Sequence, residues 1–183
     1  MHMPINNLNK ELPVTSQNLL KNLDYWKIEY KTYIHDPVMS VQEAKLIQNK
    51  LFGFDKDKGH IKNLYLRDKR KNNILIVAHQ DASIDLKLLA KIIKMERLSF
   101  GSPDRLFEHL GVLPGAVSPF AMINGAKTGV SLFLDNNLKS FSKIYAHPLE
   151  NDKTFEISIK QLEKFFEKIS IIPNWIDLDS IDN

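Results

Sequence analysis

Residues 74–79, ILIVAH, form an unbroken apolar run that follows the polar stretch Lys69–Asn73. A strand with one face in water alternates apolar and polar side chains, whereas a strand covered on both faces does not. The run therefore predicts a central strand that is buried on both faces. The segment KNLYLRD at 62–68 is rich in strand-forming residues, and the polar turn between the two segments predicts a hairpin.

The remaining elements alternate along the chain. Helices are predicted at 16–26, 40–51, 85–95, 103–110 and 160–169, and strands at 28–35, 97–100, 129–135, 143–146 and 154–159. This order predicts an α/β fold, a single domain whose mixed, mostly antiparallel sheet is flanked by helices. We place the domain at residues 15–170, with a flexible N-terminal arm at 1–14 and a C-terminal tail at 171–183.

The composition excludes several classes of site. The 183 residues include no cysteine, which rules out disulfides, thiolate metal sites and a cysteine nucleophile. No apolar segment reaches the roughly 20 residues that span a bilayer, and the polar start does not resemble a signal peptide. We therefore expect a cytoplasmic protein that does not bind membranes. The net charge of +3 permits contact with nucleic acid but does not require it.

The segment GVLPGAVSP at 111–119 holds two glycines and two prolines in nine residues, directly after a predicted helix. Such a density exceeds the needs of a plain turn and indicates a loop whose backbone is held in one shape. The usual catalytic signatures are absent: the sequence has no GxSxG, no GxxxxGK[ST], no GxGxxG and no HExxH. The six histidines show no metal-ligand spacing, so we expect no metal.

A few polar residues are candidates for a site. Lys62 begins a predicted strand and could point into a cleft at its edge, although a solvated lysine is the simpler interpretation, and Asn63 could be an ordinary turn residue. Arg67 belongs to a basic hairpin tip that either blunts a sheet edge or contacts phosphate. His147 lies in a loop between two strands, a common place for functional residues.

Three stretches, taken in order, resemble one family. They are KNLYLRD at 62–68, DLKLLAKIIKMERLSFGSPDRLFEHLGVLPGAVSPF at 85–120 and YAHPLENDKTFEIS at 145–158. Together they resemble the YbaK and prolyl-tRNA-synthetase-associated domain family of the INS-like editing superfamily, above all its free-standing ProXp-ala (PrdX) branch. The resemblance extends over about residues 16–170.

The resemblance implies a trans-editing aminoacyl-tRNA deacylase that needs no cofactor. Such an enzyme hydrolyses the ester between a wrong amino acid and the 3′ adenosine of tRNA(Pro), and this branch implies alanyl-tRNA(Pro) as the substrate. A synthetase pocket built for proline excludes the smaller alanine poorly, because lost apolar contacts are worth only about 1–3 kcal/mol. Prolyl-tRNA synthetase is a further partner that the resemblance suggests.

The resemblance also assigns roles to residues. The family's GxxxP loop, which lines the aminoacyl pocket, matches Gly115, Ala116, Val117, Ser118 and Pro119, and Asn63 joins them in binding substrate. Lys62 and His147 match the functional lysine and histidine. A lysine is mostly protonated at neutral pH, so we expect Lys62 to hold a terminal phosphate or ribose rather than act as a base. Arg67 and Arg97 flank matched motifs and are expected to contact the acceptor stem.

Two alternatives remain open from the sequence. The same fold could deacylate Cys-tRNA(Pro) or Ser-tRNA, because alanine, cysteine and serine differ by one heavy atom or less. The chain could also be a non-catalytic module that binds tRNA or a synthetase. The presence of both Lys62 and the complete GxxxP loop favours activity.

Overall fold

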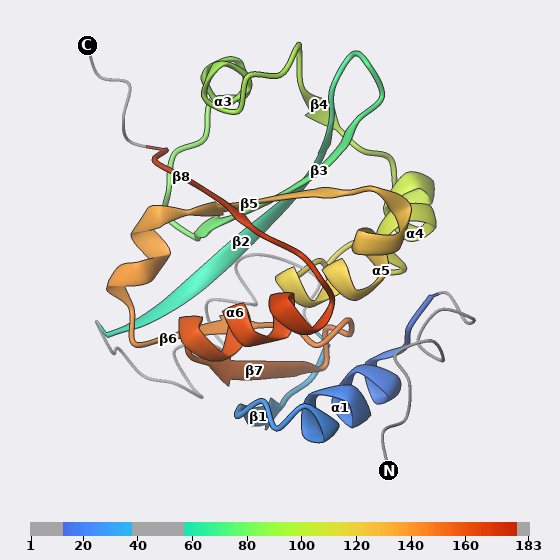
Figure 1. The fold of residues 1–183 in the computed structure, drawn as a ribbon, viewed down its shortest axis with the longest axis vertical. Helices are drawn as coiled ribbons and strands as arrows, with labels where there is room; N and C mark the ends of the chain where they lie inside the picture. The colour runs from blue at the N-terminus through green and yellow to red at the C-terminus, as the bar shows by residue number, and fades with distance from the viewer. Residues whose placement is uncertain (1–12, 38–56, 179–183) are drawn as a thin grey trace.

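A computed structural model describes residues 13–37 and 57–178 (Figure 1). These residues form an eight-stranded sheet flanked by helices, so the predicted α/β fold is confirmed. No helix in this part of the chain is long and apolar enough to cross a membrane. The strands are β1 Lys31–Ile34, β2 Lys58–Arg67, β3 Asn73–His79, β4 Ser99–Phe100, β5 Ser131–Asp135, β6 Lys143–Ala146, β7 Lys153–Ile157 and β8 Asn174–Ile176. The α-helices are α1 Ser16–Tyr25, α3 Leu86–Ile92, α4 Pro103–Leu110, α5 Met122–Thr128 and α6 Ile159–Lys168, with 3-10 helices η2 Pro119–Ala121 and η3 Asn136–Ser140.

The sheet is mixed and mostly antiparallel, as predicted. Its strand order is β1-β7-β6-β2-β3-β5-β8, and β4 pairs with the end of β2. The β1–β7, β6–β7, β2–β3 and β2–β4 pairs are antiparallel, while β2–β6, β3–β5 and β5–β8 are parallel. The first residues of β2 pair with β6 and its last residues with β4, so this long strand joins the two halves of the sheet.

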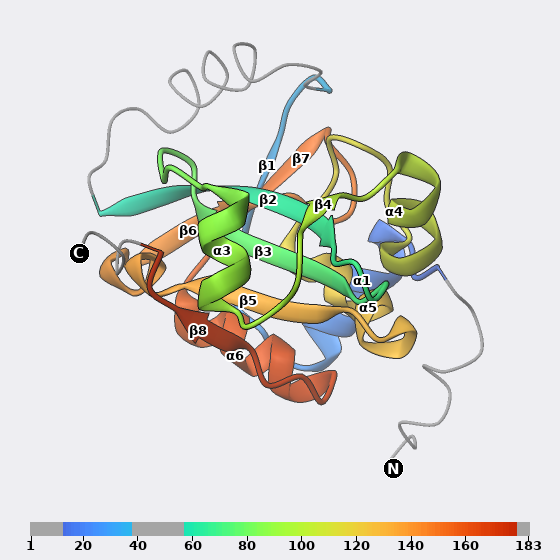
Figure 2. The same cartoon turned by 90° about the horizontal axis from the view of Figure 1, so that it is seen from above.

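The apolar run at 74–79 is a central strand, β3, with a core on each side. Leu75 and Val77 pack in a cluster with side chains of α1, α4, α5 and α6, whereas Ile74 and Ile76 pack in a second cluster with α3. Figure 2 shows α3 on one face of β3 and α6 on the other. All four side chains are fully buried, and burial of each contributes about 1.5–3 kcal/mol. These two cores explain why apolar and polar residues do not alternate in the sequence of β3.

Helix signals in the sequence place α1 and α4 well. The hydroxyl of Thr15 accepts a hydrogen bond from the amide of Asn18 at the start of α1. Ser102 caps α4 in the same way, and Gly111 ends it with a φ of +67°, a left-handed conformation that favours glycine. The predicted helix at 40–51 lies outside the described residues.

Two elements were not predicted. Helix α5 was missed because Gly125 interrupts it, but a Cβ at this position would lie 2.7 Å from Leu110 Cδ2, so close packing against α4 requires glycine. The segment expected to be a tail contributes β8, which pairs in parallel with β5. Only three residues form this strand, and three residues give too little pattern to detect it in the sequence.

Candidate functional site

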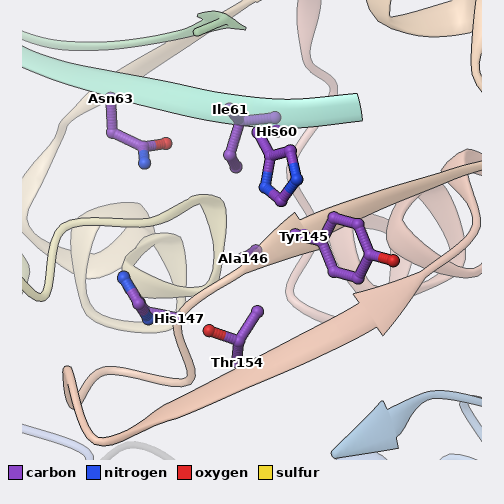
Figure 3. Close-up of a pocket in the computed structure, with 7 residues that line it drawn as sticks. All are labelled: His60, Ile61, Asn63, Tyr145, Ala146, His147 and Thr154. Carbon is purple, nitrogen blue, oxygen red and sulfur yellow. The ribbon is translucent and has the colours of Figure 1, made fainter. Parts of the chain in front are cut away.

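A cavity opens where β2 and β6 separate. Their parallel pairing ends at His60↔Tyr145, after which β2 continues to Arg67 while β6 stops at Ala146. The space between them is about 350 Å³, including its open mouth. Figure 3 shows the side chains that line it: His60, Ile61 and Asn63 from β2, Tyr145 and Ala146 from β6, His147 beyond β6, and Thr154 from β7.

His147 presents a hydrogen-bond acceptor in this cavity. Its Nδ1 lies 2.8 Å from the carbonyl oxygen of Lys153, and because a carbonyl only accepts, Nδ1 carries the proton. Burial lowers the pKa of His147 below its usual 6.5, against the opposing effect of this hydrogen bond. The imidazole is therefore neutral at pH 7, and Nε2 keeps its lone pair.

Asn63 reaches into the same cavity from the opposite strand (Figure 3). Its Oδ1 is buried and has no hydrogen-bond partner among the described residues. Buried polar atoms are normally paired, and an unpaired one carries a desolvation cost of about 1–3 kcal/mol. An unpaired acceptor in a cavity wall therefore points to a group that binds there.

Thr154 and His35 form a hydrogen-bonded pair at the cavity. His35 Nε2 lies 2.9 Å from Thr154 Oγ1, and His35 Nδ1 lies 2.8 Å from the carbonyl oxygen of Asp36. Neither residue was a candidate in the sequence. In β7 the polar residues Thr154 and Glu156 alternate with the core residues Phe155 and Ile157, and this alternation is the signal that could have indicated Thr154.

Lys62 is not among the residues that line this cavity. Successive side chains of a strand point to opposite faces, so Lys62 lies on the face of β2 that Leu66 presents to α3. Its ammonium donates a hydrogen bond to the carbonyl oxygen of Ala82, in the segment between β3 and α3. The structure therefore brings Asn63 and His147 together and places Lys62 apart from them.

The loop 115–119 does not line this cavity. Gly115 has a φ of +90°, and Ala116 and Ser118 are buried, with the hydroxyl of Ser118 accepting a hydrogen bond from the amide of Phe120. Val117 packs against the same core cluster as Ile61, which lines the cavity. The predicted contact of the loop, from Gly115 to Pro119, with an aminoacyl group stays a prediction.

The two arginines lie at the far end of β2. Arg67 is four residues beyond Asn63, about 13 Å along an extended strand, and its backbone pairs with Ser99 on β4. Arg97 is exposed and lies two residues before that pairing. Both are remote from the cavity and could contact only a ligand that extends well beyond it, so their role stays a prediction.

A buried ionic cluster supports one wall of the cavity. The carboxylate of Glu156 accepts hydrogen bonds from Lys58, Lys143, Tyr33 and Tyr145. The Tyr145 ring in turn stacks on His60, with 4.7 Å between centroids. Burial, with a smaller effect of the nearby His79, lowers the pKa of His60 to about 4, so this ring is also neutral. In the described part of the chain, no three histidine, aspartate or glutamate side chains gather as a metal site would require.

Comparison with known proteins agrees with this fold. The family model for the aminoacyl-tRNA editing domain matches residues 35–165. The chain is 38% identical over 149 residues to the prolyl-tRNA editing protein ProX of Acetoanaerobium sticklandii, with 81% of this chain and 88% of that protein covered. It is 28% identical over 174 residues to prolyl-tRNA synthetase associated domain-containing protein 1 of Danio rerio, covering 94% and 88% of the two chains.

The fold is also found among solved structures. A crystal structure described as a candidate trans-editing enzyme for prolyl-tRNA synthetase superposes with a TM-score of 0.63 at 15% identity, covering 92% of this chain and 99% of that one. At this identity the likeness shows the fold alone. The family match and the relative at 38% identity carry the assignment. The chain belongs to the aminoacyl-tRNA editing domain family, and the predicted class of enzyme is thereby confirmed.

Proposed function

We propose that the protein is a free-standing deacylase that hydrolyses misacylated tRNA(Pro), with alanyl-tRNA(Pro) as its substrate. The relative at 38% identity is a prolyl-tRNA editing protein, which supports the choice of tRNA. The observation that carries the proposal is the neutral His147, whose free Nε2 lines the same cavity as the Asn63 amide. A hydrolytic site needs an acceptor for a proton of water and a polar group at the ester, and this cavity supplies both.

The chemistry follows from these two groups. A water molecule attacks the ester carbonyl, and the bond between that carbon and the 3′ oxygen breaks. His147 Nε2 accepts a proton from the water, directly or through the 2′ hydroxyl of the substrate, and the departing 3′ oxygen regains it. The Asn63 amide N–H donates to the carbonyl oxygen as negative charge develops there. The chain contains no cysteine, and no covalent intermediate with the protein is required.

Size supplies the selection against proline. In this proposal the aminoacyl group and the terminal ribose share the space between β2 and β6, about 350 Å³ including its open mouth. The loop 115–119 holds glycine and proline, and its backbone cannot retreat as a flexible side chain would. We propose that this loop limits the amino acid to the size of alanine. Cysteine and serine are close to that limit and are the alternative substrates.

Lys62 has a separate role in this proposal. Because its ammonium lies on the other face of β2 at Ala82, we assign it to a phosphate of the tRNA rather than to the ester. Arg67, at the end of the same strand, and Arg97, just before the paired strand β4, would contact the acceptor stem. Replacement of Lys62 by Ala is then expected to raise KM and weaken the salt dependence of KM, and to leave kcat within a few-fold.

Prolyl-tRNA synthetase is the protein partner we propose. The support is the name of the Danio rerio relative, a prolyl-tRNA synthetase associated domain-containing protein. An enzyme that edits the product of that synthetase gains speed when the two proteins lie close together, because the effective concentration of the ester rises. Co-sedimentation of the two purified proteins, with and without tRNA(Pro), tests the association.

The test of function is a deacylation time course with Ala-tRNA(Pro), Cys-tRNA(Pro) and Pro-tRNA(Pro). Wild type should release alanine and spare proline, and His147→Ala should lower kcat by about 100-fold or more, the usual contribution of a general base. Glu167→Gln, on an exposed part of α6, is the control and should match wild type. If wild type cleaves no ester above the spontaneous rate, the protein is a binding module. If cysteine is released faster than alanine, the substrate assignment changes.

A further inference from the structure

Phe100 in β4 presents an aromatic ring to solvent on an anchored backbone. Its side chain is 65% exposed, whereas Leu98, two residues earlier, is buried in the core beside α3. Phe100 pairs with Leu66 of β2, and the amide of the next residue, Gly101, donates to the carbonyl oxygen of Tyr65 at 3.0 Å. A single exposed apolar residue is common, so a binding role for this ring depends on what surrounds it.

The ring and the cavity lie on the same side of β2, because β3 pairs along the other side (Figure 2). On this side β6 pairs with β2 only as far as His60, and contact with β4 begins at Tyr65, so no described strand adjoins β2 between them. Asn63, which lines the cavity, is in the middle of this stretch. It is three residues, about 10 Å, from Leu66, the partner of Phe100. A ligand that leaves the cavity along β2 reaches Phe100 over this short distance.

Phe100 also shares a face of the sheet with Lys62. Leu66 is the partner of Phe100 and is four residues from Lys62, so the pleat gives all three side chains the same direction. The separation along β2 is about 13 Å. About four stacked nucleotides span this length, at about 3.4 Å each, and an extended strand spans it with fewer. The lysine assigned to a phosphate and the ring of Phe100 therefore fit one short single strand of RNA.

Three arginines surround Phe100. Arg97 is exposed three residues before it, Arg67 pairs with the residue next to it, and Arg105 is in the first turn of α4. None of the three guanidinium groups forms an ion pair with a carboxylate among residues 13–37 and 57–178. These cations are therefore available for the phosphates of a ligand.

The charges near the Tyr65 hydroxyl place Arg105 close to Arg67. Burial raises the pKa of Tyr65 to about 12, while Arg67 acts to lower it, Glu108 to raise it and Arg105 to lower it. Residues 67–71 and 96–108 together hold six arginines and lysines and four carboxylates, and one of these carboxylates is already bound to Arg70. The charge around Phe100 thus favours a polyanion.

We propose that Phe100 is the stacking platform for an unpaired base that precedes the 3′ adenosine of the tRNA, with Arg97 and Arg105 on the phosphates beside that base. The inference rests on the proposed function, which supplies an unpaired RNA end as ligand. Every base has a face that stacks on an aromatic ring, so this contact adds affinity without selecting a sequence. The ring acts as a positioning residue: it holds the single strand while the ester lies in the cavity.

Binding of deacylated tRNA(Pro) tests the platform without any need for hydrolysis, with affinities measured by fluorescence anisotropy. Phe100→Ala should weaken binding about 10-fold, and Phe100→Trp should restore it. Phe100→Leu keeps an apolar side chain but removes the ring, so it should behave like Phe100→Ala. Tyr25→Ala removes a ring of similar exposure, 67%, from the end of α1 and should match wild type. Equal affinities for wild type and Phe100→Ala overturn the inference.

Removal of single bases from the RNA identifies the partner of the ring. An abasic nucleotide at one unpaired position before the terminal adenosine should weaken binding to wild type about 10-fold, and Phe100→Ala should then cause no further loss. Losses that add at every position overturn the platform. Phe100→Ala should also leave the slope of log Kd against log salt concentration unchanged, while Arg97→Gln should reduce this slope by about 1.

Deacylation of Ala-tRNA(Pro) separates this inference from the proposed function. Cleavage in which Phe100→Ala raises KM about 10-fold and leaves kcat within a few-fold supports both. Cleavage with an unchanged KM supports the deacylase and overturns the platform. Loss of tRNA affinity in Phe100→Ala without cleavage by wild type supports the platform and refutes hydrolysis. If Phe100→Ala weakens binding to prolyl-tRNA synthetase but not to tRNA(Pro), the ring belongs to a protein interface and the platform is overturned.

Discussion

Glu156 offers a quantitative test of the structure, because its carboxylate joins four strands. The side chain is 4% exposed and accepts hydrogen bonds from Lys143 at 2.8 Å, Lys58 at 3.1 Å, Tyr33 at 3.1 Å and Tyr145 at 3.2 Å. Burial alone would raise the pKa of Glu156, but the hydrogen bonds from Lys143, Lys58 and Tyr33 outweigh burial and lower it from 4.5 to about 2. The charged carboxylate therefore stabilises the folded state.

The size of this stabilisation follows from the pKa. A decrease from 4.5 to about 2 corresponds to about 3 kcal/mol, at about 1.4 kcal/mol per pH unit. Lys58 and Lys143 are 28% and 45% exposed, so water screens part of this free energy. We therefore expect Glu156→Gln to lower the free energy of unfolding by about 2 kcal/mol at pH 7, and the melting temperature by about 4–8 °C.

The pH dependence of the stability difference between wild type and Glu156→Gln shows whether the charge of Glu156 is its cause. Because the folded pKa of Glu156 is depressed, its contribution is complete above pH 4.5 and is lost as the pH falls toward 2. Urea unfolding of wild type and Glu156→Gln at several pH values between 7 and 2.5 should show two curves that converge. Glu150→Gln, which removes a half-exposed partner of Lys153, is the control and should change stability by less than about 0.5 kcal/mol. A difference that is constant with pH, or equal for the two variants, would refute the reasoning.

Three further predictions concern single residues. Gly111→Ala should lower the free energy of unfolding by more than the cost of a left-handed φ alone, which is about 1–2 kcal/mol. The added Cβ would also lie 2.5 Å from Asn124 Nδ2. Gly129→Ala, with nothing within 4 Å of its Cβ, should show only that conformational cost in urea unfolding. The deacylation rate should keep its neutral plateau down to below pH 6.5 and then fall as His147 gains a proton, which a pH profile of kcat/KM would show. Asn124→Ala should cost about 1–3 kcal/mol of unfolding free energy, since it leaves buried backbone groups of Val14 and Leu110 unpaired.

The sequence predicts the framework better than the site. The pattern at 74–79 places β3, and the residues Thr15, Ser102 and Gly111 place the ends of two helices, because each of these signals acts over a few neighbouring residues. Gly125 is the counterexample in the framework. Glycine disfavours a helix, and the close packing against Leu110 explains why this helix nevertheless has glycine at position 125.

The site depends on contacts that no local pattern encodes. Lys62 and Asn63 are neighbours in the sequence and both were candidates, yet the pleat of β2 sends them to different faces. His35 and Thr154 are 119 positions apart and meet only because β1 pairs with β7. The resemblance to a family named Asn63 and His147, which line one cavity, but it did not point to Thr154, which the pairing of β6 and β7 brings there.

The order of the strands along the chain determines when each strand of the sheet can find its partner during synthesis. The hairpin of β2 and β3 is local and can form early, but both of its outer neighbours, β6 and β5, come later in the sequence. About 90 residues separate Asn63 from Thr154, so roughly 5–20 s of synthesis pass at common elongation rates before the far wall of the cavity exists. During that time the hairpin presents two unpaired edges, which are prone to join other strands. A nascent chain therefore has an incomplete cavity until β7 has been synthesised, and the edges of its hairpin stay open to pairing with other strands until then.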